Sequence, residues 1–268
     1  MELSFAARLL RFIVPLLGLD ERRCALCRTP FVVPAGAGGA GQSGTDALLC
    51  AACRSRLPRR RAGFCPHCGE PSSLDDAPLV PCASCLQALP PWEHFLFHGI
   101  YEGGLREAVL RGKFGGSLTS LDMLGGLLAE VCAEHYASAP KPQIIVPIPL
   151  HVSRLRERGF NQSLELARVL GRVLDLPVRH DLLTRVRPTV PQASLSREQR
   201  KKLVQPFAAG EGVRGRRVLV VDDVCTTGAT LACAARCLLE AGAVQVDAAA
   251  VARTSLHSLP VASPRSGS

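Results

Sequence analysis

The chain has 268 residues, of which 47% are hydrophobic and 21% are charged. This balance is typical of folded globular proteins and excludes wholesale disorder, and the length allows one large or two modest domains. The formal net charge of +9 favours anionic ligands such as phosphates or nucleic acid, while nine Phe, two Tyr and one Trp leave few rings for stacking the bases of a single strand.

The first 19 residues are predicted to form a short amphipathic helix. The longest uncharged apolar stretch, Phe12 to Leu19, is interrupted by Pro15 and Gly18 and is too short to span a bilayer. It is followed by charged residues rather than by a small-residue cleavage site. No other segment approaches the length of a membrane span, so we expect no membrane span and a cytoplasmic location.

Residues 20–91 are rich in Cys, Pro, Gly and Arg and are predicted to form a metal-binding module. Eight of the 12 cysteines fall in four Cys-x-x-Cys pairs, which are Cys24 and Cys27, Cys50 and Cys53, Cys65 and Cys68, and Cys82 and Cys85. Two such pairs supply the four thiolates of a tetrahedral zinc site, with no ligand position left open. Taken in order, the pairs therefore predict two structural Zn²⁺ sites, the first two pairs forming one and the last two the other.

Three alternatives stay open at this point. The spacer between Cys27 and Cys50 exceeds the usual length, and the Gly-rich stretch within 34–45 explains the excess. A crossed combination of the pairs is nevertheless an alternative. His67 could replace a thiolate, although we expect its side chain to point outward. An iron–sulfur cluster also uses four thiolates and is a minor alternative.

From residue 92 onward the pattern predicts helices that alternate with strands. Apolar residues at helical spacing over 105–136, broken at Gly115 and Gly116, predict two helices. The other elements are three buried strands and two helices, at residues 143–148, 218–221 and 244–251 and at residues 161–174 and 230–240. Such alternation favours an α/β fold, with a parallel sheet flanked by helices on both faces.

The segment 218–230, VLVVDDVCTTGAT, is predicted to bind a phosphorylated ribose. Its strand leads to the carboxyl edge of the sheet, where open α/β folds bind ligands. Asp222 and Asp223 suit the ribose hydroxyls, and backbone N–H groups at the following helix N-terminus suit a phosphate. The predicted phosphate-binding residues are Thr226, Thr227, Gly228, Ala229 and Thr230. An ordinary helix cap is the alternative, but these acids, hydroxyls and glycine exceed what capping needs.

This segment resembles the signature of type I phosphoribosyltransferases. Further segments narrow the resemblance to the ComF family of competence-associated phosphoribosyltransferase-like proteins: the cysteine pairs, VPIPLH at 146–151, RGFNQ at 158–162, and Thr189, Gln192, Leu195 and Arg200. The resemblance spans residues 24 to about 251. It implies a type I phosphoribosyltransferase fold over 92–254 behind a double zinc-ribbon module at 20–91, with the N-terminal helix at 1–19 and a disordered tail at 255–268.

The resemblance also implies a substrate and a mechanism. Phosphoribosyl pyrophosphate would bind with Mg²⁺ and lose pyrophosphate through a cationic sugar, with Asp222 and Asp223 as catalytic residues. Arg158 and Asn161 are predicted to bind the substrate on its pyrophosphate side, and a solvated basic turn is the alternative. The sequence does not identify the acceptor.

Further positions also bear on the site. The resemblance implies a mobile hood over 185–207, in which Leu203 replaces an expected Asn, so a polar contact is expected to be missing. Lys113 and Phe114 match a family segment, while a cation at a helix end is the simpler interpretation. Cys225 lies within the phosphate loop, where we expect a small residue rather than a reactive thiol.

Two classes of function fit these motifs. The first is an enzyme, a phosphoribosyltransferase whose partner is phosphoribosyl pyrophosphate. The second is a non-catalytic adaptor or single-stranded DNA-binding protein with a regulatory or vestigial sugar-phosphate site. Its partners would be single-stranded DNA and competence proteins.

Overall fold

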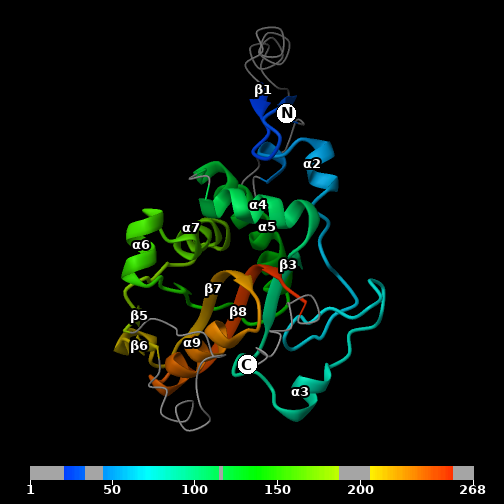
Figure 1. Ribbon diagram of the computed structural model, residues 1–268. Helices are drawn as coiled ribbons and strands as arrows, with labels where there is room; N and C mark the ends of the chain where they lie inside the picture. Colours follow the sequence, from blue (N-terminus) through cyan, green and yellow to red (C-terminus); the bar gives the residue numbers. More distant parts are fainter. Residues whose placement is uncertain (1–20, 34–44, 115–116, 187–205, 256–268) are drawn as a thin grey trace, which may run out of the picture.

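The computed structural model describes residues 21–33, 45–114, 117–186 and 206–255 (Figure 1). The predictions for a helix at 1–19 and a disordered tail at 255–268 lie outside these residues, apart from residue 255 itself. The same holds for most of the predicted hood, including Thr189, Gln192 and Leu203.

A four-stranded parallel sheet lies at the centre of the molecule. Its strand order is β3 (Phe95–Ile100), β8 (Gln245–Arg253), β7 (Arg217–Cys225) and β4 (Ile144–Pro147), and all three neighbouring pairs are parallel (Figure 1). Strands β3, β4 and β8 are almost continuously buried, and β7 is buried from Val218 to Val221, as expected for a parallel sheet covered on both faces. The predicted α/β fold is therefore confirmed, with β3 as a strand that the sequence pattern did not indicate.

Three helices cover one face of the sheet. They are α4 (Gly103–Phe114), α5 (Leu118–His135) and α7 (Gln162–Leu174). Leu219 and Val221 of β7 join the apolar cluster that these helices form. The predicted pair of helices over 105–136 is confirmed, and none of the helices in the described part of the chain combines the length and apolar character needed to cross a bilayer.

The opposite face packs against α9 (Ala229–Glu240) and a short antiparallel pair, β5 (Leu183–Arg185) and β6 (Phe207–Ala209). Val218 and Val220 point to this side, into a second apolar cluster. Neighbouring residues of β7 thus alternate between two cores, which is the period-two pattern of a strand buried on both faces.

Two local expectations need correction. The arginine-rich segment before α7 forms a short helix, α6 (Val152–Arg158), that ends at Gly159 with a left-handed φ of 77°. Strand β7 also runs four residues beyond Val221, so Asp222 and Asp223 belong to the strand and not to the loop after it. The strand extends because β8 pairs with it as far as Cys225.

The N-terminal cysteine-rich part consists of two small modules. The first contains the antiparallel pair β1 (Glu21–Arg23) and β2 (Pro30–Val32), the single turn η1 (Thr45–Ala47) and helix α2 (Ala51–Ser55). The second contains helix α3 (Ala83–Gln87). Figure 1 shows the two modules at different sides of the sheet, the first beyond α4 and the second beside the strands.

Candidate phosphoribose and metal sites

The eight predicted metal ligands form two compact groups. The Sγ atoms of Cys24, Cys27, Cys50 and Cys53 all lie within 4.8 Å of one another, and so do those of Cys65, Cys68, Cys82 and Cys85. The in-order combination of the pairs is thereby confirmed and the crossed order excluded. His67 adds no ligand atom to the second group.

The sulfur spacing fits a metal better than a disulfide. Cys27 and Cys50 have Sγ atoms 3.7 Å apart, and those of Cys68 and Cys82 are 3.6 Å apart. Zinc–sulfur bonds of about 2.3 Å in a tetrahedron place two sulfurs about 3.8 Å apart, whereas a disulfide bond is about 2.05 Å long. Each group could therefore hold one zinc ion.

The two predicted catalytic carboxylates contact different helices. Asp222 Oδ1 accepts hydrogen bonds from the Ser163 hydroxyl at 3.0 Å and from the Asp223 N–H at 2.9 Å. Asp223 Oδ2 pairs with Lys113 Nζ at 3.0 Å, and these two side chains are only 17% and 19% exposed. Lys113 is therefore more than a solvated helix-end cation, because it neutralises one of the two acids.

Asp222 lies in an unusual electrostatic environment. Burial and the neighbouring charge of Asp223 raise the pKa of Asp222 to about 7, and the hydroxyl of Ser163 and the charge of Lys113 act in the opposite direction. Asp222 therefore changes its charge near neutral pH. A carboxylate at the carboxyl edge of a parallel sheet with such a pKa is typical of a functional site.

The loop after β7 leads directly into α9. Thr226 and Thr227 are exposed, and Thr227 Oγ1 accepts a hydrogen bond from the N–H of Ala229 at 3.3 Å. Gly228 is the N-cap of α9 with a φ of 76°, a left-handed conformation that favours glycine. The predicted phosphate-binding residues thus gather at the N-terminus of α9.

Cys225 precedes this loop and is buried. Burial raises the pKa of its thiol to about 12. The thiol is therefore protonated at neutral pH, which agrees with the expectation that it is not a reactive nucleophile.

Arg158 is the last residue of α6 and Asn161 is the N-cap of α7, so both lie between β4 and α7 along the chain. The side chain of Asn161 caps α7 by accepting a hydrogen bond from the N–H of Ser163 at 3.1 Å, and it donates to the Ile148 carbonyl at 3.0 Å. Arg158 donates to Gln162 Oε1 at 3.4 Å. Asn161 thus connects the end of β4 to the residue that holds Asp222.

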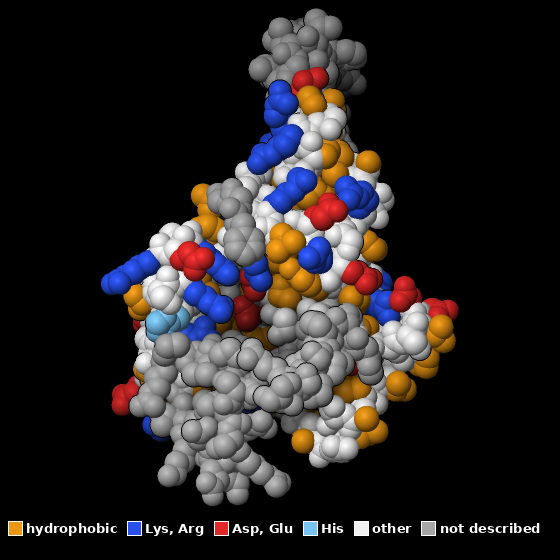
Figure 2. All heavy atoms as spheres, in the orientation of Figure 1, with side chains coloured by type: hydrophobic (Ala, Val, Ile, Leu, Met, Phe, Trp, Pro, Cys, Tyr) orange, Lys and Arg blue, Asp and Glu red, His pale blue; other side chains and the backbone are white. Residues whose placement is uncertain are grey.

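Arg185 is a basic residue that sequence reasoning assigned only to the hood. It donates to the Pro149 carbonyl at 3.4 Å, and its guanidinium lies 5.3 Å from the centroid of the Phe207 ring. Burial and the charge of Arg154 lower the pKa of Arg185, while the charge of Asp222 raises it, so Arg185 lies within electrostatic reach of both. Figure 2 shows Lys and Arg side chains gathered over α6 and over the first cysteine module, with acidic side chains between them.

Known proteins resemble this chain over most of its length. Residues 161–261 match the model of the phosphoribosyl transferase domain family. The DNA utilization protein YhgH of Salmonella typhi is 34% identical over 86% of this chain and 96% of its own length. Competence protein F of Haemophilus influenzae is 30% identical over 76% of this chain and 90% of its own. Competence protein ComFC of Bacillus subtilis is 28% identical over 84% of this chain and 92% of its own length.

Solved structures also resemble the chain. The match to glutamine phosphoribosylpyrophosphate amidotransferase from B. subtilis covers 55% of this chain and 27% of that protein, with 22% identity and a TM-score of 0.34. The match to purine phosphoribosyltransferase from Pyrococcus horikoshii covers 52% of this chain and 77% of that protein, with 20% identity and a TM-score of 0.35. With the type I phosphoribosyltransferase fold preceded by two four-cysteine groups, and with relatives aligned over most of its length, the chain belongs to the ComF family of competence-associated proteins.

Proposed function

We propose that the protein binds phosphoribosyl pyrophosphate with Mg²⁺ and acts as a phosphoribosyltransferase. The observation that carries this proposal is the pair Asp222 and Asp223 at the end of β7, next to the N-terminus of α9. Carboxylates suit ribose hydroxyls, and a helix N-terminus suits a phosphate. A 5-phosphorylated ribose satisfies both halves of this arrangement.

Each group has a role in this proposal. Residues 226–230 hold the 5-phosphate through backbone N–H groups and threonine hydroxyls. Asp222 and Asp223 accept hydrogen bonds from the ribose hydroxyls, and their negative charge favours a cationic sugar in the transition state. Lys113 keeps one of the two carboxylates neutralised until the ligand arrives.

The pyrophosphate lies on the opposite side in this proposal. Arg158 supplies charge, and Asn161 keeps the segment between β4 and α7 in place through its two backbone contacts. Arg185 adds positive charge within electrostatic reach of Asp222, and Arg154 lies within electrostatic reach of Arg185. Arginines in such a position stabilise the negative charge of a departing pyrophosphate.

Mg²⁺ fits this donor set, because it prefers oxygen ligands and is commonly held by one or two carboxylates together with substrate phosphates. Asp222 and Asp223 are the residues that would hold it. When bound, the ion neutralises charge that develops on the leaving group. For the cysteine groups we propose two structural zinc ions, since all eight thiolates are consumed as ligands.

The direct test is binding of phosphoribosyl pyrophosphate measured by calorimetry with and without Mg²⁺. Asp222→Asn and Asp223→Asn should each weaken binding. Asp122→Asn is the matched control, because Asp122 is an exposed carboxylate of α5 that is ion-paired to Arg172. Equal weak binding by the wild type and all three variants would remove the site assignment. Turnover is tested by screening nitrogen nucleophiles for Mg²⁺-dependent release of pyrophosphate.

Single-stranded DNA is a second candidate ligand. A cavity of about 400 Å³ is lined by Arg59, Arg60 and Arg61 together with Phe64 and His135. The names of the relatives, which refer to competence and DNA utilization, favour this candidate as well. Titration of single-stranded DNA at several salt concentrations tests it, since phosphate contacts make affinity fall with salt. A lack of binding near physiological salt would exclude it.

A further inference from the structure

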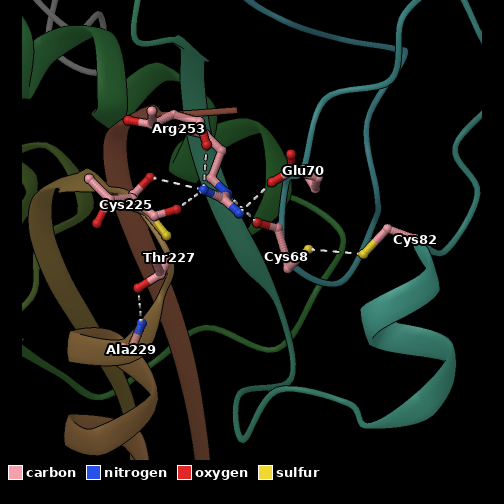
Figure 3. Close-up of polar contacts among 9 residues, drawn as sticks. Cys68, Glu70, Cys82, Cys225, Thr227, Ala229 and Arg253 are labelled. Carbon is pink, nitrogen blue, oxygen red and sulfur yellow. Dashed lines mark hydrogen bonds and ion pairs between the residues drawn. The ribbon is translucent and has the colours of Figure 1, made fainter. Parts of the chain in front are cut away.

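Arg253, the last residue of β8, is buried against the second cysteine module. Its Nη2 lies 2.7 Å from Glu70 Oε2, and the two side chains are only 2% and 8% exposed (Figure 3). Glu70 is two residues after the metal-ligand candidate Cys68. A buried ion pair is costly to disrupt, because removing one partner leaves an uncompensated charge in the interior.

The same guanidinium also contacts the phosphate loop. Its Nε donates to the Cys68 carbonyl at 2.9 Å, while Nη1 donates to the carbonyls of Cys225, at 3.2 Å, and Thr226 (Figure 3). One side chain therefore connects the second cysteine group to the start of the proposed phosphate site.

These contacts determine which way the loop peptides face. In a planar trans peptide the carbonyl of one residue and the N–H of the next point in opposite directions. Because Arg253 holds the carbonyls of Cys225 and Thr226, the N–H groups of Thr226 and Thr227 point away from the buried guanidinium. They are thus directed to the exposed side of the loop, where a phosphate would bind.

A second connection runs through Trp92. Its Nε1–H donates to the His67 carbonyl at 2.7 Å, inside the Cys65–Cys68 turn. A Cβ atom added to Gly228 would lie 3.3 Å from the Trp92 ring. The indole therefore packs between the turn of the second cysteine group and the N-cap of α9.

We infer that Glu70 and Arg253 are positioning residues that make ligand binding at the phosphate loop depend on the metal of the second cysteine group. This inference rests on the proposed function. The metal holds Cys65 and Cys68 in one tight turn, and the turn holds Glu70 against Arg253. Without the metal this turn loses its constraint, and the Arg253 guanidinium loses the anchor that holds it against the loop carbonyls.

The first cysteine group provides the contrast. Its module is connected to the helices on one face of the sheet, since Arg54 pairs with Glu130 of α5 at 2.7 Å and Arg111 of α4 donates to the Leu26 carbonyl. Loss of its metal is expected to loosen these helices rather than the phosphate loop. Coupling between sites is reciprocal, so a ligand at the loop should in turn strengthen metal binding in the second group alone.

Cys82→Ser and Cys50→Ser form a matched pair for the test. Each cysteine is half-buried and is the N-cap of a five-residue helix, α3 for Cys82 and α2 for Cys50. Zinc content is measured first, and binding of phosphoribosyl pyrophosphate with Mg²⁺ by calorimetry second. Cys82→Ser should weaken binding roughly 5- to 150-fold, the usual range for coupled sites, and Cys50→Ser should weaken it less than about twofold. Equal losses in the two variants would overturn the inference.

A milder pair of variants keeps all eight thiolates. Glu70→Gln and Arg253→Lys should retain two equivalents of zinc and still weaken binding, because they disturb only the contact between turn and loop. If both variants bind phosphoribosyl pyrophosphate as tightly as the wild type, the proposed role of Glu70 and Arg253 is contradicted.

A readout without ligand separates failure of this inference from failure of the proposed function. Hydrogen exchange of the amides at 226–230 should accelerate in Cys82→Ser and stay unchanged in Cys50→Ser. Fluorescence of Trp92, the single tryptophan, should change in the same variant only. If the wild type binds no phosphoribosyl pyrophosphate, the proposed function fails. The exchange rates then still show whether the second cysteine group controls the conformation of the phosphate loop. Unchanged exchange in Cys82→Ser overturns the inference.

Discussion

The two cysteine modules share one ligand set but are attached to different parts of the phosphoribosyltransferase domain. The first packs against α4 and α5, where Leu26 and Leu57 join the same apolar cluster as Leu127. The second packs against β3, where the Phe64 ring meets the Phe97 ring edge-on at a centroid distance of 5.0 Å. Two similar local motifs are therefore attached to different surfaces of one domain.

The backbone shows the same difference at the residue after each first pair. Arg28 has a φ of 66° and an exposed side chain, and Gly69 has a φ of 70° at the equivalent position. A Cβ at Gly69 would lie 2.7 Å from an atom of the Phe95 ring. The second turn requires glycine because the domain core closes over it, whereas the first turn faces solvent.

The largest expected effect concerns the buried charges of the two modules. Arg253→Met should lower the free energy of unfolding by about 3–5 kcal/mol, because it removes the ion-pair partner of the buried Glu70 carboxylate. Arg54→Met is the comparison, since Arg54 and Glu130 are 34% and 25% exposed and such partly exposed pairs contribute about 1 kcal/mol or less. Urea denaturation measures both. Similar losses would mean that the second module is no more tightly connected than the first.

The next effect concerns the two turns. Gly69→Ala should destabilise the protein by about 2–5 kcal/mol, the sum of left-handed strain and overpacking against Phe95. Arg28→Gly should be neutral or should stabilise by up to about 1 kcal/mol, because relief of strain opposes the added chain entropy. Thermal denaturation at fixed zinc content tests both. A stabilising Gly69→Ala variant would contradict the tight packing described for the second module.

The pH dependence of ligand binding tests the acid side of the site. Since the pKa of free Asp222 is raised to about 7 and the ligand favours its charged form, binding below pH 7 must release a proton. Affinity should therefore rise about tenfold per pH unit up to about pH 7 and then level off. The Asp222→Asn variant should bind weakly and should not show this rise of affinity with pH. Calorimetry in buffers of different ionisation enthalpy measures the number of protons released on binding. No difference between the two profiles would exclude Asp222 as the titrating group.

The smallest effect is a shift of that profile. Lys113→Met removes a positive charge that lowers the pKa of Asp222, so the midpoint of the binding profile should move to higher pH. Arg111→Met is the control from the same helix, because Arg111 contacts the Leu26 carbonyl of the first module and not the acids. It should lower stability and leave the midpoint in place. A shift of equal size in both variants would point to a general loosening of α4.

The parts of the site that lie together along the chain could be predicted from the sequence. The cysteine pairs, the break between α4 and α5, and the segment from β7 to α9 are local patterns, and their backbone conformation follows from neighbouring residues. Strand β3 was missed because it is short, follows a proline-rich segment and contains the buried His98. Helix α6 was missed because only Val152 and Leu155 of its seven residues are apolar, and none of the seven is buried.

The sequence by itself thus determined the candidate ligand groups: eight cysteine thiols, two adjacent carboxylates and a glycine-containing loop before a helix. The tertiary structure alone decided which distant groups act on these residues. Lys113 and Ser163 come from two different helices to Asp223 and Asp222, and Arg253 meets Glu70 from 183 positions away along the chain. No local pattern encodes such pairs, because they form only when β8, packed between its neighbours, brings its last residue against the second cysteine module.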